Sequence, residues 1–490
     1  MFNFLNRVFK LEENKTTVRT EIIAGLTTFF AMCYIVVVNP VQMIGTIPGT
    51  NTPNNPALFN ACFVGGIIAA VVATLLMAFV ANKPFALAAG MGLNSFFFVS
   101  FILPHILSGK YENLPNGYQA GLSIILLSGA IFLILSVTGA RQFIAKALPE
   151  PIKVAVPAGI GLFIAFIGLQ NAGIVVPNQY TGVAFATFRD EATNEFMVGP
   201  MISILTALVG FVLIIVFNNS KIGFLKKGSI ILGILAATLF YYVLSFILVK
   251  DYWDSFKALF TNNKLSNVFS DWAKYGLGGA IKGFKFAFDG TTVGSIFTVI
   301  MLVITYCLVD MFDTLGTIYG TSAEANMLDE EGNPEKLGQA MLCDSIGTVA
   351  GSLTGTSTVT TFVESASGVA AGGRTGLTSV VTALLLLVCL FFAPIANVIP
   401  SAATAPALMF VGLLMFKNIL RIDFSDFLFV AASFTTLFMM VVTYSISNGI
   451  MIGSIVYVLL ALLTGKYSKK DIVVTCIAVL AILRYIFVNM

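Results

Sequence analysis

The sequence has few of the residues on which soluble and enzymatic functions depend. Charged residues make up only 10% of the 490 positions, and histidine occurs once. A soluble protein with 57% hydrophobic residues could not bury most of its apolar surface, so the composition indicates a polytopic membrane protein. The net charge of +3 is small and the basic residues do not gather on one stripe, so we expect no nucleic-acid partner.

Cysteine and histidine are too few and too scattered for metal or redox chemistry. His105 is the single histidine, and no two cysteines form a CxxC pair. The cysteines are Cys33, Cys62, Cys307, Cys343, Cys389 and Cys476. We therefore expect no metal site, no cofactor and no enzymatic activity, and we interpret the cysteines as packing residues.

Hydrophobic runs long enough to cross a bilayer recur along the whole chain. We count fourteen candidate spans, at residues 22–44, 57–81, 84–104, 119–139, 152–176, 199–217, 229–249, 293–320, 339–353, 354–371, 377–398, 401–416, 425–443 and 446–464. A further run at 472–488 is either a fifteenth span or a helix on the membrane surface. The first twenty residues predict a short amphipathic helix on the membrane surface, or else a frayed tail.

The distribution of Lys and Arg predicts the orientation of the chain. These residues concentrate at the N-terminus and in the loops after even-numbered spans, which places the N-terminus in the cytoplasm of a multi-pass plasma-membrane protein. One long polar segment, 250–291, separates two sets of seven spans, and we interpret it as an external linker. The expected divisions are an N-terminal segment 1–21, a first repeat 22–249, the linker, a second repeat 292–465 and a C-terminal apolar segment 466–490.

An odd number of spans in each half implies two repeats of inverted topology, as in many secondary transporters. Matching breaks support this: the third span is interrupted around Gly90-Met91-Gly92, and the tenth carries Gly355-Thr356-Ser357-Thr358-Val359-Thr360-Thr361. Unwound backbone at such a break can bind a polar ligand. Alternatively, the small residues serve tight helix packing.

A polar residue follows each break and precedes a renewed helical run. Asn94 and Ser95 take this place in the third span, and Glu364 and Ser365 in the tenth. Asn and Ser begin helices well, and the dipole at a helix start favours an anion such as Glu364. We therefore expect Asn94 and Glu364 to mark the starts of two helices that point at the site.

Carboxylates occur at membrane depth in the second half. Asp310 and Asp313 share one face of a helix with Thr314, and charges at this depth are costly and mark functional sites by default. The alternative is that the helix ends at the surface and leaves both aspartates in water. Counted from residue 293, Asp310 lies about 25 Å along the helix, deeper than a midplane site requires. Asp344 is either a helix cap or a supporting residue.

Several strings resemble the AzgA-like adenine/guanine/hypoxanthine permeases of the nucleobase–cation symporter-2 family. They are the segment 309–317 (VDMFDTLGT), the segment 355–358 (GTST), the segment 363–378 (VESASGVAAGGRTGLT), the segment 90–94 (GMGLN) and the opening segment 19–29 (RTEIIAGLTTF). The resemblance covers nearly the whole chain. It implies an all-α membrane protein of fourteen spans in 7+7 inverted repeats, with short strands breaking spans 3 and 10. It also implies a core of spans 1–4 and 8–11, a gate of spans 5–7 and 12–14, a homodimer, and proton-coupled uptake of purine nucleobases, with sodium the less favoured ion.

The expected site combines residue chemistry with this resemblance. The expected substrate-binding residues are Asp310, Asp313, Glu364, Asn94, Gly92, Thr314 and Thr361, with Phe30, Phe96 or Phe97 as a stacking face. Burial favours the protonated form of a carboxylic acid, and a neighbouring carboxylate favours it further, so proton coupling is expected at Glu364, Asp313, Asp310 and Asp344. The alternatives are another nucleobase such as xanthine or uracil, or an anion transporter or channel; an anion site would call for a basic residue at the breaks, and none is visible there. The preferred purine, the coupling ion and the choice between Asp310 and Asp313 as the substrate contact stay open.

Overall fold

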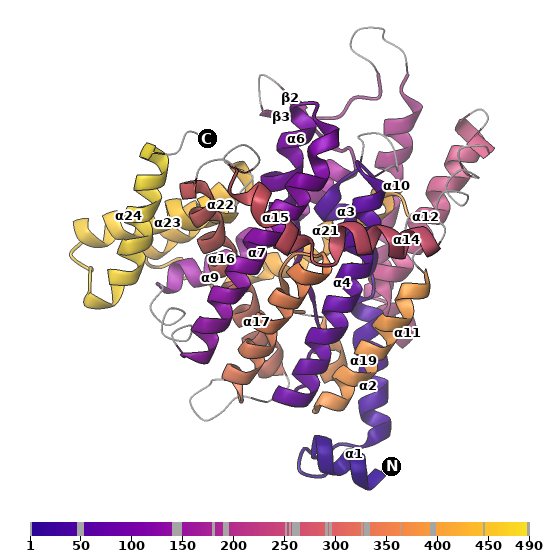
Figure 1. The fold of residues 1–490 in the computed structure, drawn as a ribbon, viewed down its shortest axis with the longest axis horizontal. Helices are drawn as coiled ribbons and strands as arrows, with labels where there is room; N and C mark the ends of the chain where they lie inside the picture. The colour runs from indigo at the N-terminus through magenta and orange to yellow at the C-terminus, as the bar shows by residue number, and fades with distance from the viewer. Residues whose placement is uncertain are drawn as a thin grey trace.

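The fold is that of a computed structural model of the chain, and it consists almost entirely of helices (Figure 1). The structure describes residues 2–46, 53–139, 149–178, 182–189, 196–249, 252–253, 256, 265–289, 293, 296–324, 327, 334–362, 364–392, 398–443 and 446–487. The helices of the first half are α1 (Phe2–Phe9), α2 (Val18–Met32), α3 (Ile35–Ile44), α4 (Pro56–Leu76), α5 (Met91–Phe97), α6 (Leu103–Leu107), α7 (Leu114–Val137), α9 (Glu150–Asn171), α10 (Val198–Asn218), α11 (Gly223–Lys227) and α12 (Ser229–Leu248). Those of the second half are α14 (Leu265–Asp271), α15 (Gly279–Ala287), α16 (Ile296–Glu324), α17 (Leu337–Thr354), α18 (Ser365–Ala370), α19 (Gly376–Val388), α21 (Ser401–Phe416), α22 (Phe427–Val442), α23 (Ile446–Leu463) and α24 (Ile472–Phe487).

Apolar helices of spanning length account for much of the described chain. Within it, seven are long and apolar enough to cross a membrane: Val18–Ile44, Pro56–Ala81, Tyr111–Val137, Glu150–Asn171, Val198–Asn218, Ser229–Leu248 and Ser401–Arg421. Further apolar helices are shorter, among them Met91–Leu107, Gly376–Phe392 and Phe427–Val442. The chain is therefore a multi-pass membrane protein.

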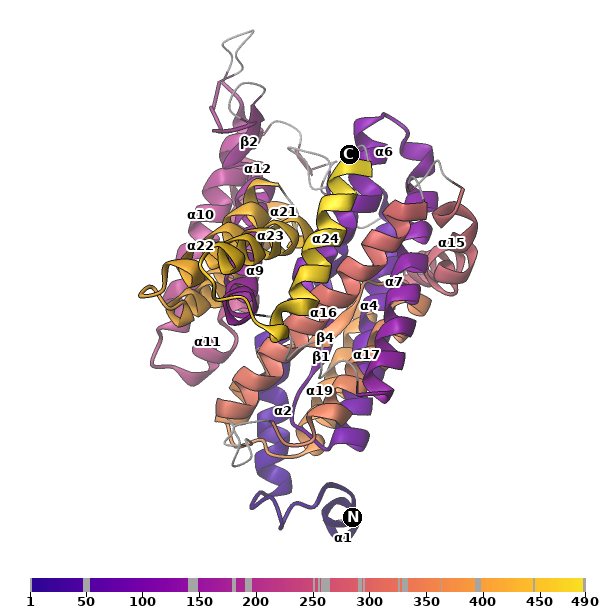
Figure 2. The same cartoon turned by 90° about the vertical axis from the view of Figure 1, so that its left-hand side faces the viewer.

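The helices form two groups that lie side by side (Figure 2). We call the first group the strand group, because it contains two short strands, Leu87–Ala89 and Val359–Thr361. In this group α4 packs against α3, α17 and α19, α7 packs against α17, and α2 packs against α18 and α19. In the flanking group, α9 packs against α21 and α22, α10 packs against α12 and α21, and α22 packs against α23. Helix α16 lies at the boundary, because it contacts α7 and α17 in one group and α9 and α23 in the other.

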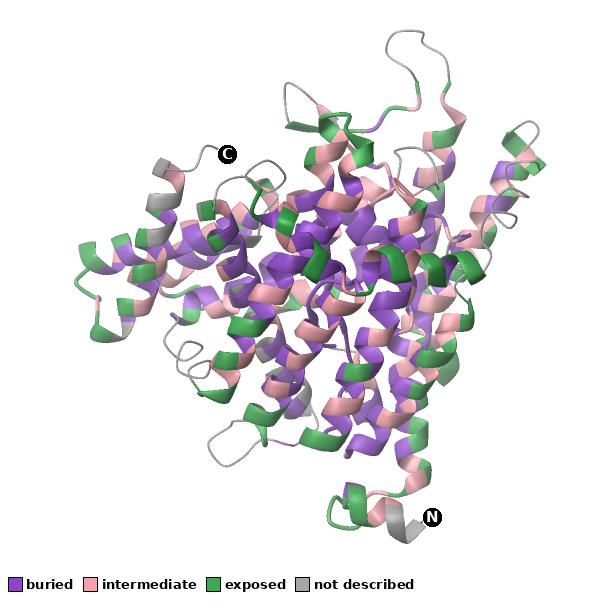
Figure 3. Ribbon diagram, in the orientation of Figure 1, coloured by how far each residue is buried: buried purple, intermediate pink, exposed green. Residues whose placement is uncertain are grey.

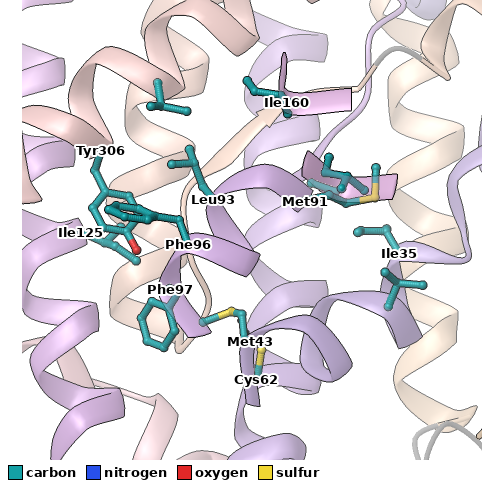
Figure 4. Close-up of a cluster of buried hydrophobic side chains, with 14 of the residues drawn as sticks. Ile35, Met43, Cys62, Met91, Leu93, Phe96, Phe97, Ile125, Ile160 and Tyr306 are labelled. Atoms are coloured by element: carbon teal, nitrogen blue, oxygen red, sulfur yellow. Dashed lines mark hydrogen bonds between the residues drawn. The ribbon is translucent and has the colours of Figure 1, made fainter. Parts of the chain in front are cut away.

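Buried residues concentrate where these helices meet, and exposed residues lie at the ends and on the outward faces (Figure 3). Many outward side chains are apolar: Leu239 is 68% exposed and Val212 is 57% exposed. Such faces suit contact with lipid, because hydrocarbon does not penalise an exposed apolar side chain. The largest buried cluster surrounds α5 and includes Leu93, Phe96 and Tyr306 (Figure 4).

Two short strands, one from each half of the chain, pair at the centre of the strand group (Figure 2). Strand β1 (Leu87–Ala89) runs antiparallel to β4 (Val359–Thr361), with Ala88 opposite Thr360. Each strand leads into a short helix, β1 into α5 and β4 into α18. The prediction of strands in spans 3 and 10 is confirmed. β-branched residues stabilise the second strand, since Val and Thr favour extended backbone.

The segment between the two halves is a folded part of the strand group where the structure describes it. Helices α14 and α15 pack against α4 and α7 respectively. The indole N–H of Trp272, which lies between them, donates to the carbonyl oxygen of Thr354 at 2.7 Å, at the last residue of α17. The Tyr118 hydroxyl donates to the carbonyl oxygen of the next residue, Gly355, whose φ of +108° requires glycine. The expected linker character of 257–264 and 290–291 falls outside the described residues.

The ends of the chain also pack onto the helix bundle. The predicted amphipathic segment forms α1, and Phe9 at its end is buried with Leu377 of α19. At the other end, α24 doubles back along α23, with the Tyr457 hydroxyl 3.1 Å from an Asp471 carboxylate oxygen. A second pair of antiparallel strands, β2 (Val175–Asn178) and β3 (Gly182–Phe185), lies at the end of the molecule opposite α1 (Figure 1). This pair was not predicted.

Candidate functional site

The paired strands are the centre of the candidate site. Backbone hydrogen bonds extend the pairing beyond them: the N–H of Gly90 donates to the carbonyl of Thr358 at 3.0 Å, and the N–H of Phe362 donates to the carbonyl of Ala86 at 2.9 Å. The ladder therefore satisfies backbone groups that hydrocarbon could not satisfy. Both broken spans are held in one fixed register across the two halves of the chain.

The strand register assigns each side chain to one of two faces. Leu87, Ala89, Val359 and Thr361 share the face that packs on α4 and α17, because alternate residues of a strand point the same way and paired residues share a face. Ala88, Gly90, Thr358 and Thr360 share the other face, which we call the open face. Thr361 was predicted to bind substrate, but it lies on the first face, away from the open face. We therefore do not include it in the proposed site.

Asp310 lies at the midpoint of the 29-residue helix α16, so the helix extends well beyond it on both sides. This removes the difficulty about its depth, because the helix does not begin or end near the site. The Thr348 hydroxyl donates to Oδ2 of Asp310 at 3.0 Å and accepts from the backbone N–H of Val359 at 3.3 Å. Asp310 is 1% exposed. Its side chain is thus tied through α17 to strand β4.

Asp344 and Thr314 form a second buried pair one helical turn away. The Thr314 hydroxyl donates to Oδ1 of Asp344 at 2.8 Å, and both residues are fully buried. Asp344 lies two turns inside α17, which begins at Leu337, so it is not a helix cap. Of the two roles predicted for Asp344, the supporting role fits this position.

Asp313 faces the strands from α16. It is less buried than Asp310, its side chain lies close to Thr360 on the open face, and Asp344 and Glu364 lie close enough for their charges to interact with it. Asp313 is therefore the α16 carboxylate nearest to the open face.

Glu364 stands at the start of α18, as predicted, but its carboxylate does not bond to the helix start. Instead it accepts a hydrogen bond from the hydroxyl of Tyr34. Tyr34 is fully buried at the break between α2 and α3, and its hydroxyl lies 3.8 Å from the sulfur of Met91, the first residue of α5. Tyr34 thus joins a third broken span to the two that the strands connect.

Asn94 lies inside α5, whose first residue is Met91 and whose N-cap is Gly90, so the prediction that Asn94 begins this helix is wrong. The unwound segment ends earlier than expected, because Met91 and the following residues continue directly as a helix. The Asn94 side chain is fully buried; it accepts a hydrogen bond from the Ser357 hydroxyl and donates to Gln42 at 3.4 Å. It therefore joins α5 to α3 and to the segment that precedes β4.

Comparison with known proteins decides the family. The sequence model of the Permease family matches residues 19–452, which include every residue of the site. The chain belongs to this permease family. It is a transporter and not an enzyme.

The relatives of this permease match it over almost its whole length. The adenine permease AdeP of Escherichia coli K12 is 34% identical over 99% of this chain and 96% of its own, and the guanine/hypoxanthine permease PbuG of Bacillus subtilis 168 is 34% identical over 98% of this chain and 99% of its own. Among solved structures, the transmembrane domain of a cyanobacterial bicarbonate transporter, BicA, has a TM-score of 0.58 at 12% identity and covers 88% of this chain and 97% of its own. That likeness shows the fold alone.

The aromatic residues expected to stack on a substrate lie in two different places in the permease. Phe96 and Phe97 are buried in the apolar cluster around α5, where Phe96 packs on Tyr306 and Phe97 on Tyr118 (Figure 4). Phe30 lies on α2, and its ring is 5.9 Å from that of Phe224 in α11. Gly92 is buried within the first turn of α5.

Glu21 is a buried carboxylate that was not predicted as a functional residue. It fixes α18, the helix that begins next to Glu364. Glu21 of α2 is fully buried; it accepts from the Thr378 hydroxyl at 2.6 Å and from the backbone N–H of Arg374 at 2.9 Å. The Arg374 side chain in turn donates to the carbonyl of Val369 in α18 at 2.8 Å. Glu21 therefore caps α19 and holds α18 in place, and its position in the first turn of an apolar helix is the sequence signal for such a role.

The chemistry available at this permease site is that of hydrogen bonding and proton binding. Asp313 lies beside Thr360 on the open face and close enough to Glu364 for their charges to interact, whereas the Asp310 and Asp344 carboxylates bond to threonines of neighbouring helices. Among the residues that the structure describes, no group of three or more His, Cys, Asp or Glu could hold a metal ion. Of the residues expected in the site, Asp313 lies nearest to the open face, Glu364 bonds to Tyr34, and Asn94 bonds to Ser357 in the segment before β4.

Proposed function

We propose that this permease carries purine nucleobases, namely hypoxanthine, guanine or adenine, across the plasma membrane. The observation that carries the proposal is the position of Asp313, which lies beside Thr360 on the open face of the paired strands and close enough to Glu364, from a different span, for their charges to interact. The names of the full-length relatives, adenine permeases and guanine/hypoxanthine permeases, supply the substrate class. Xanthine or uracil is the alternative within the same fold.

The open face suits a flat polar ring. A purine base has two apolar faces and an edge of N–H donors and N or C=O acceptors, so its site needs a smooth wall and a few fixed polar partners. Ala88 and Gly90 give the strand a wall without bulky side chains, and the carboxylates and the Thr360 hydroxyl supply partners for the edge. The flat base would lie against the strands with its edge toward α16 and Glu364.

Proton coupling fits the same carboxylates better than sodium coupling. Two carboxylates of the same charge that approach each other in a desolvated site favour sharing a proton. In our proposal Glu364 or Asp313 takes up the proton with the base, while Asp310 and Asp344 keep α16 and α17 in register. This mechanism requires no metal ion.

The transport cycle we propose moves the strand group against the flanking group. In this proposal the strand group corresponds to the predicted core of spans 1–4 and 8–11, and the flanking group corresponds to the predicted gate of spans 5–7 and 12–14, which would give fourteen spans. The base and proton travel with the strand group, as in an elevator, in a homodimer whose N-termini face the cytoplasm. The boundary at α16 is the surface along which the two groups would slide.

Uptake of labelled hypoxanthine by cells that lack their own purine permeases tests the proposal. We expect accumulation that collapses with a protonophore, resists removal of sodium, and disappears in Glu364→Gln. Glu112→Gln, which changes an exposed glutamate in the same way, should transport normally. A panel of unlabelled adenine, guanine, xanthine and uracil as competitors then identifies the preferred base. Absence of purine uptake by the native protein, or uptake unaffected by both the protonophore and Glu364→Gln, would contradict the proposal.

A further inference from the structure

One side chain on the open face has no role in the interactions described so far. Thr358 immediately precedes β4 and is fully buried, yet its hydroxyl has no hydrogen-bond partner among the described residues. A buried hydroxyl that bonds to nothing is unfavourable, so native structures rarely leave one without a partner, a water or a ligand. Of the neighbouring hydroxyls, Thr356 bonds to Asn39 and Ser357 bonds to Asn94, whereas that of Thr361, on the opposite strand face, also has no partner among the described residues.

Gly90 lies directly beside Thr358 and Thr360. The backbone of Gly90 has a φ of −70° and a ψ of 117°, which any residue can adopt, so its conformation does not require glycine. A Cβ at Gly90 would instead lie 3.2 Å from Cγ2 of Thr360 and 3.6 Å from the Thr358 hydroxyl oxygen. The absence of a side chain at Gly90 therefore lets the backbone lie close to both threonines, and glycine is also the residue that allows close approach of a ligand to the backbone.

Strand geometry separates these two threonines from the third in the same string. Thr358 and Thr360 point to the open face, where Thr360 lies close to the Asp313 side chain. Thr361 points to the opposite face, together with Val359, which packs with Ala69 and Ala73 of α4. Three threonines in four positions therefore divide between the site and the packed core of the strand group.

We propose that Thr358 and Thr360 are substrate-binding residues and that the hydroxyl of Thr358 bonds directly to the polar edge of the base. The inference rests on the proposed function and adds to it the partners that the strand side chains supply. A threonine hydroxyl can donate to a ring nitrogen or a carbonyl oxygen and can accept from a ring N–H. The Thr360 hydroxyl lies close to Asp313, so these two side chains would bind the base together. The Thr358 hydroxyl would bind one atom of the base on its own.

Thr→Val substitutions test the proposal, because valine keeps the shape of threonine and removes the hydroxyl. We expect Thr358→Val to raise the KM for hypoxanthine about five-fold, in keeping with loss of one uncharged hydrogen bond, and Thr360→Val to raise it at least as much. Thr206→Val is the matched control: Thr206 is also buried with an unpartnered hydroxyl, but it lies on α10 in the flanking group. Its KM should stay unchanged. Thr361→Val tests the opposite strand face and should have no more effect than the control.

Substrate analogues separate a direct contact from a structural effect. The inhibition constants of purine, which lacks the 6-oxo group, and of hypoxanthine analogues with one ring nitrogen at a time replaced by carbon are compared in the native protein and in Thr358→Val. We expect one analogue, the one that lacks the atom bonded by Thr358, to bind both proteins equally, while the others lose about five-fold in the variant. Equal losses for all analogues, an unchanged KM in Thr358→Val, or an effect in Thr361→Val alone would overturn the inference.

Gly90→Ala tests the space itself. The added methyl group would occupy the room beside the two threonines, so we expect loss of hypoxanthine binding with normal surface expression and an unchanged unfolding temperature in detergent. Normal uptake by Gly90→Ala would overturn the inference. A native protein that takes up no purine at all would contradict the proposed function instead, so the two failures are distinguishable.

Discussion

At the scale of single residues, the hydrogen bond from Tyr34 to Glu364 is the contact that orients the candidate proton-binding group. Glu364 lies at the beginning of a six-residue helix and its carboxylate makes no bond to that helix, so the orientation of the carboxylate depends on its partner. Tyr34 is fully buried, which fixes its ring. Hydrogen bonds to charged groups contribute about 1.5–3 kcal/mol, more than bonds between neutral groups, so this contact is large enough to control the site.

Tyr34→Phe should therefore impair transport while leaving the fold intact. The ring and its packing stay, the donor to Glu364 is lost, and we expect the KM for hypoxanthine to rise ten-fold or more, which corresponds to about 1.4 kcal/mol. Tyr306→Phe is the control: Tyr306 is equally buried, but its hydroxyl has no partner among the described residues (Figure 4). Uptake kinetics at equal surface expression measure both variants, and equal behaviour of the two would show that the Tyr34 hydroxyl has no special role.

The residues of the site differ in how far the sequence predicts them. Asp310, Asp313 and Glu364 are charges in apolar runs, and this contrast alone predicts them as site residues. Tyr34 gave no such signal, because a tyrosine in an apolar span is usual and no glycine or proline marks the break beside it. Thr358, Thr360 and Thr361 look equivalent in the sequence, and only the strand register separates them. Side-chain partners over long sequence separations are set by packing, which local patterns do not contain.

At the scale of elements, local composition predicts the breaks but not the boundaries of the helices around them. The Gly-containing clusters in spans 3 and 10 predict the breaks, because glycine disfavours a continuous helix, whereas the short strands were implied by the family resemblance. The start of α5 at Met91 instead of Asn94 was missed, since Gly90 serves as the cap. The docking of α14 and α15 on α4 and α7 was also missed, because their polar composition resembles that of a linker.

The interface between α2 and α18 depends on the absence of side chains. A Cβ at Gly368 of α18 would lie 2.0 Å from the Thr28 hydroxyl oxygen and 2.9 Å from the carbonyl oxygen of Ala24, both on α2. Helices approach this closely in membranes when small residues line the contact. Because α18 begins next to Glu364, this interface and the Glu21 cap together set the position of that carboxylate.

Gly368→Ala should accordingly displace α18 and destabilise the protein. Overpacking of a close contact costs about 1–3 kcal/mol, so we expect a lower unfolding temperature in detergent and reduced hypoxanthine uptake. Thr28→Ala should partly restore both, because it removes the hydroxyl oxygen that the new methyl group meets. Gly199→Ala provides the control, since a Cβ there has no neighbour within 4 Å. A Gly368→Ala protein with the native unfolding temperature would show that α2 and α18 are free to separate.

At the scale of the whole molecule, the arrangement of the two groups suits relative movement. The site is built from α16, β1, β4 and Tyr34. All of these belong to the strand group or to its boundary, so the site can move as one body. Contacts between the groups run along a few elements: α9 touches α5 and α16, and α11 touches α2. We propose that the two groups correspond to the predicted core and gate. The packing of α24 against α23 could not be predicted, since an apolar run alone does not distinguish a span from a surface helix.

A reversible cross-link between the groups should stop transport. The rings of Phe30 on α2 and Phe224 on α11 lie 5.9 Å apart across the boundary. In a variant whose six cysteines are replaced by alanine, Phe30→Cys with Phe224→Cys is treated with a bifunctional thiol reagent. We expect hypoxanthine uptake to fall to background and to return with a reductant, because the reagent ties the moving group to the fixed one. The control pair, Phe9→Cys with Phe79→Cys, has rings 5.7 Å apart within the strand group and should cross-link without loss of uptake. Native uptake rates in the cross-linked boundary pair would mean that the two groups need not move, and the base would then have to cross by a path within a rigid protein.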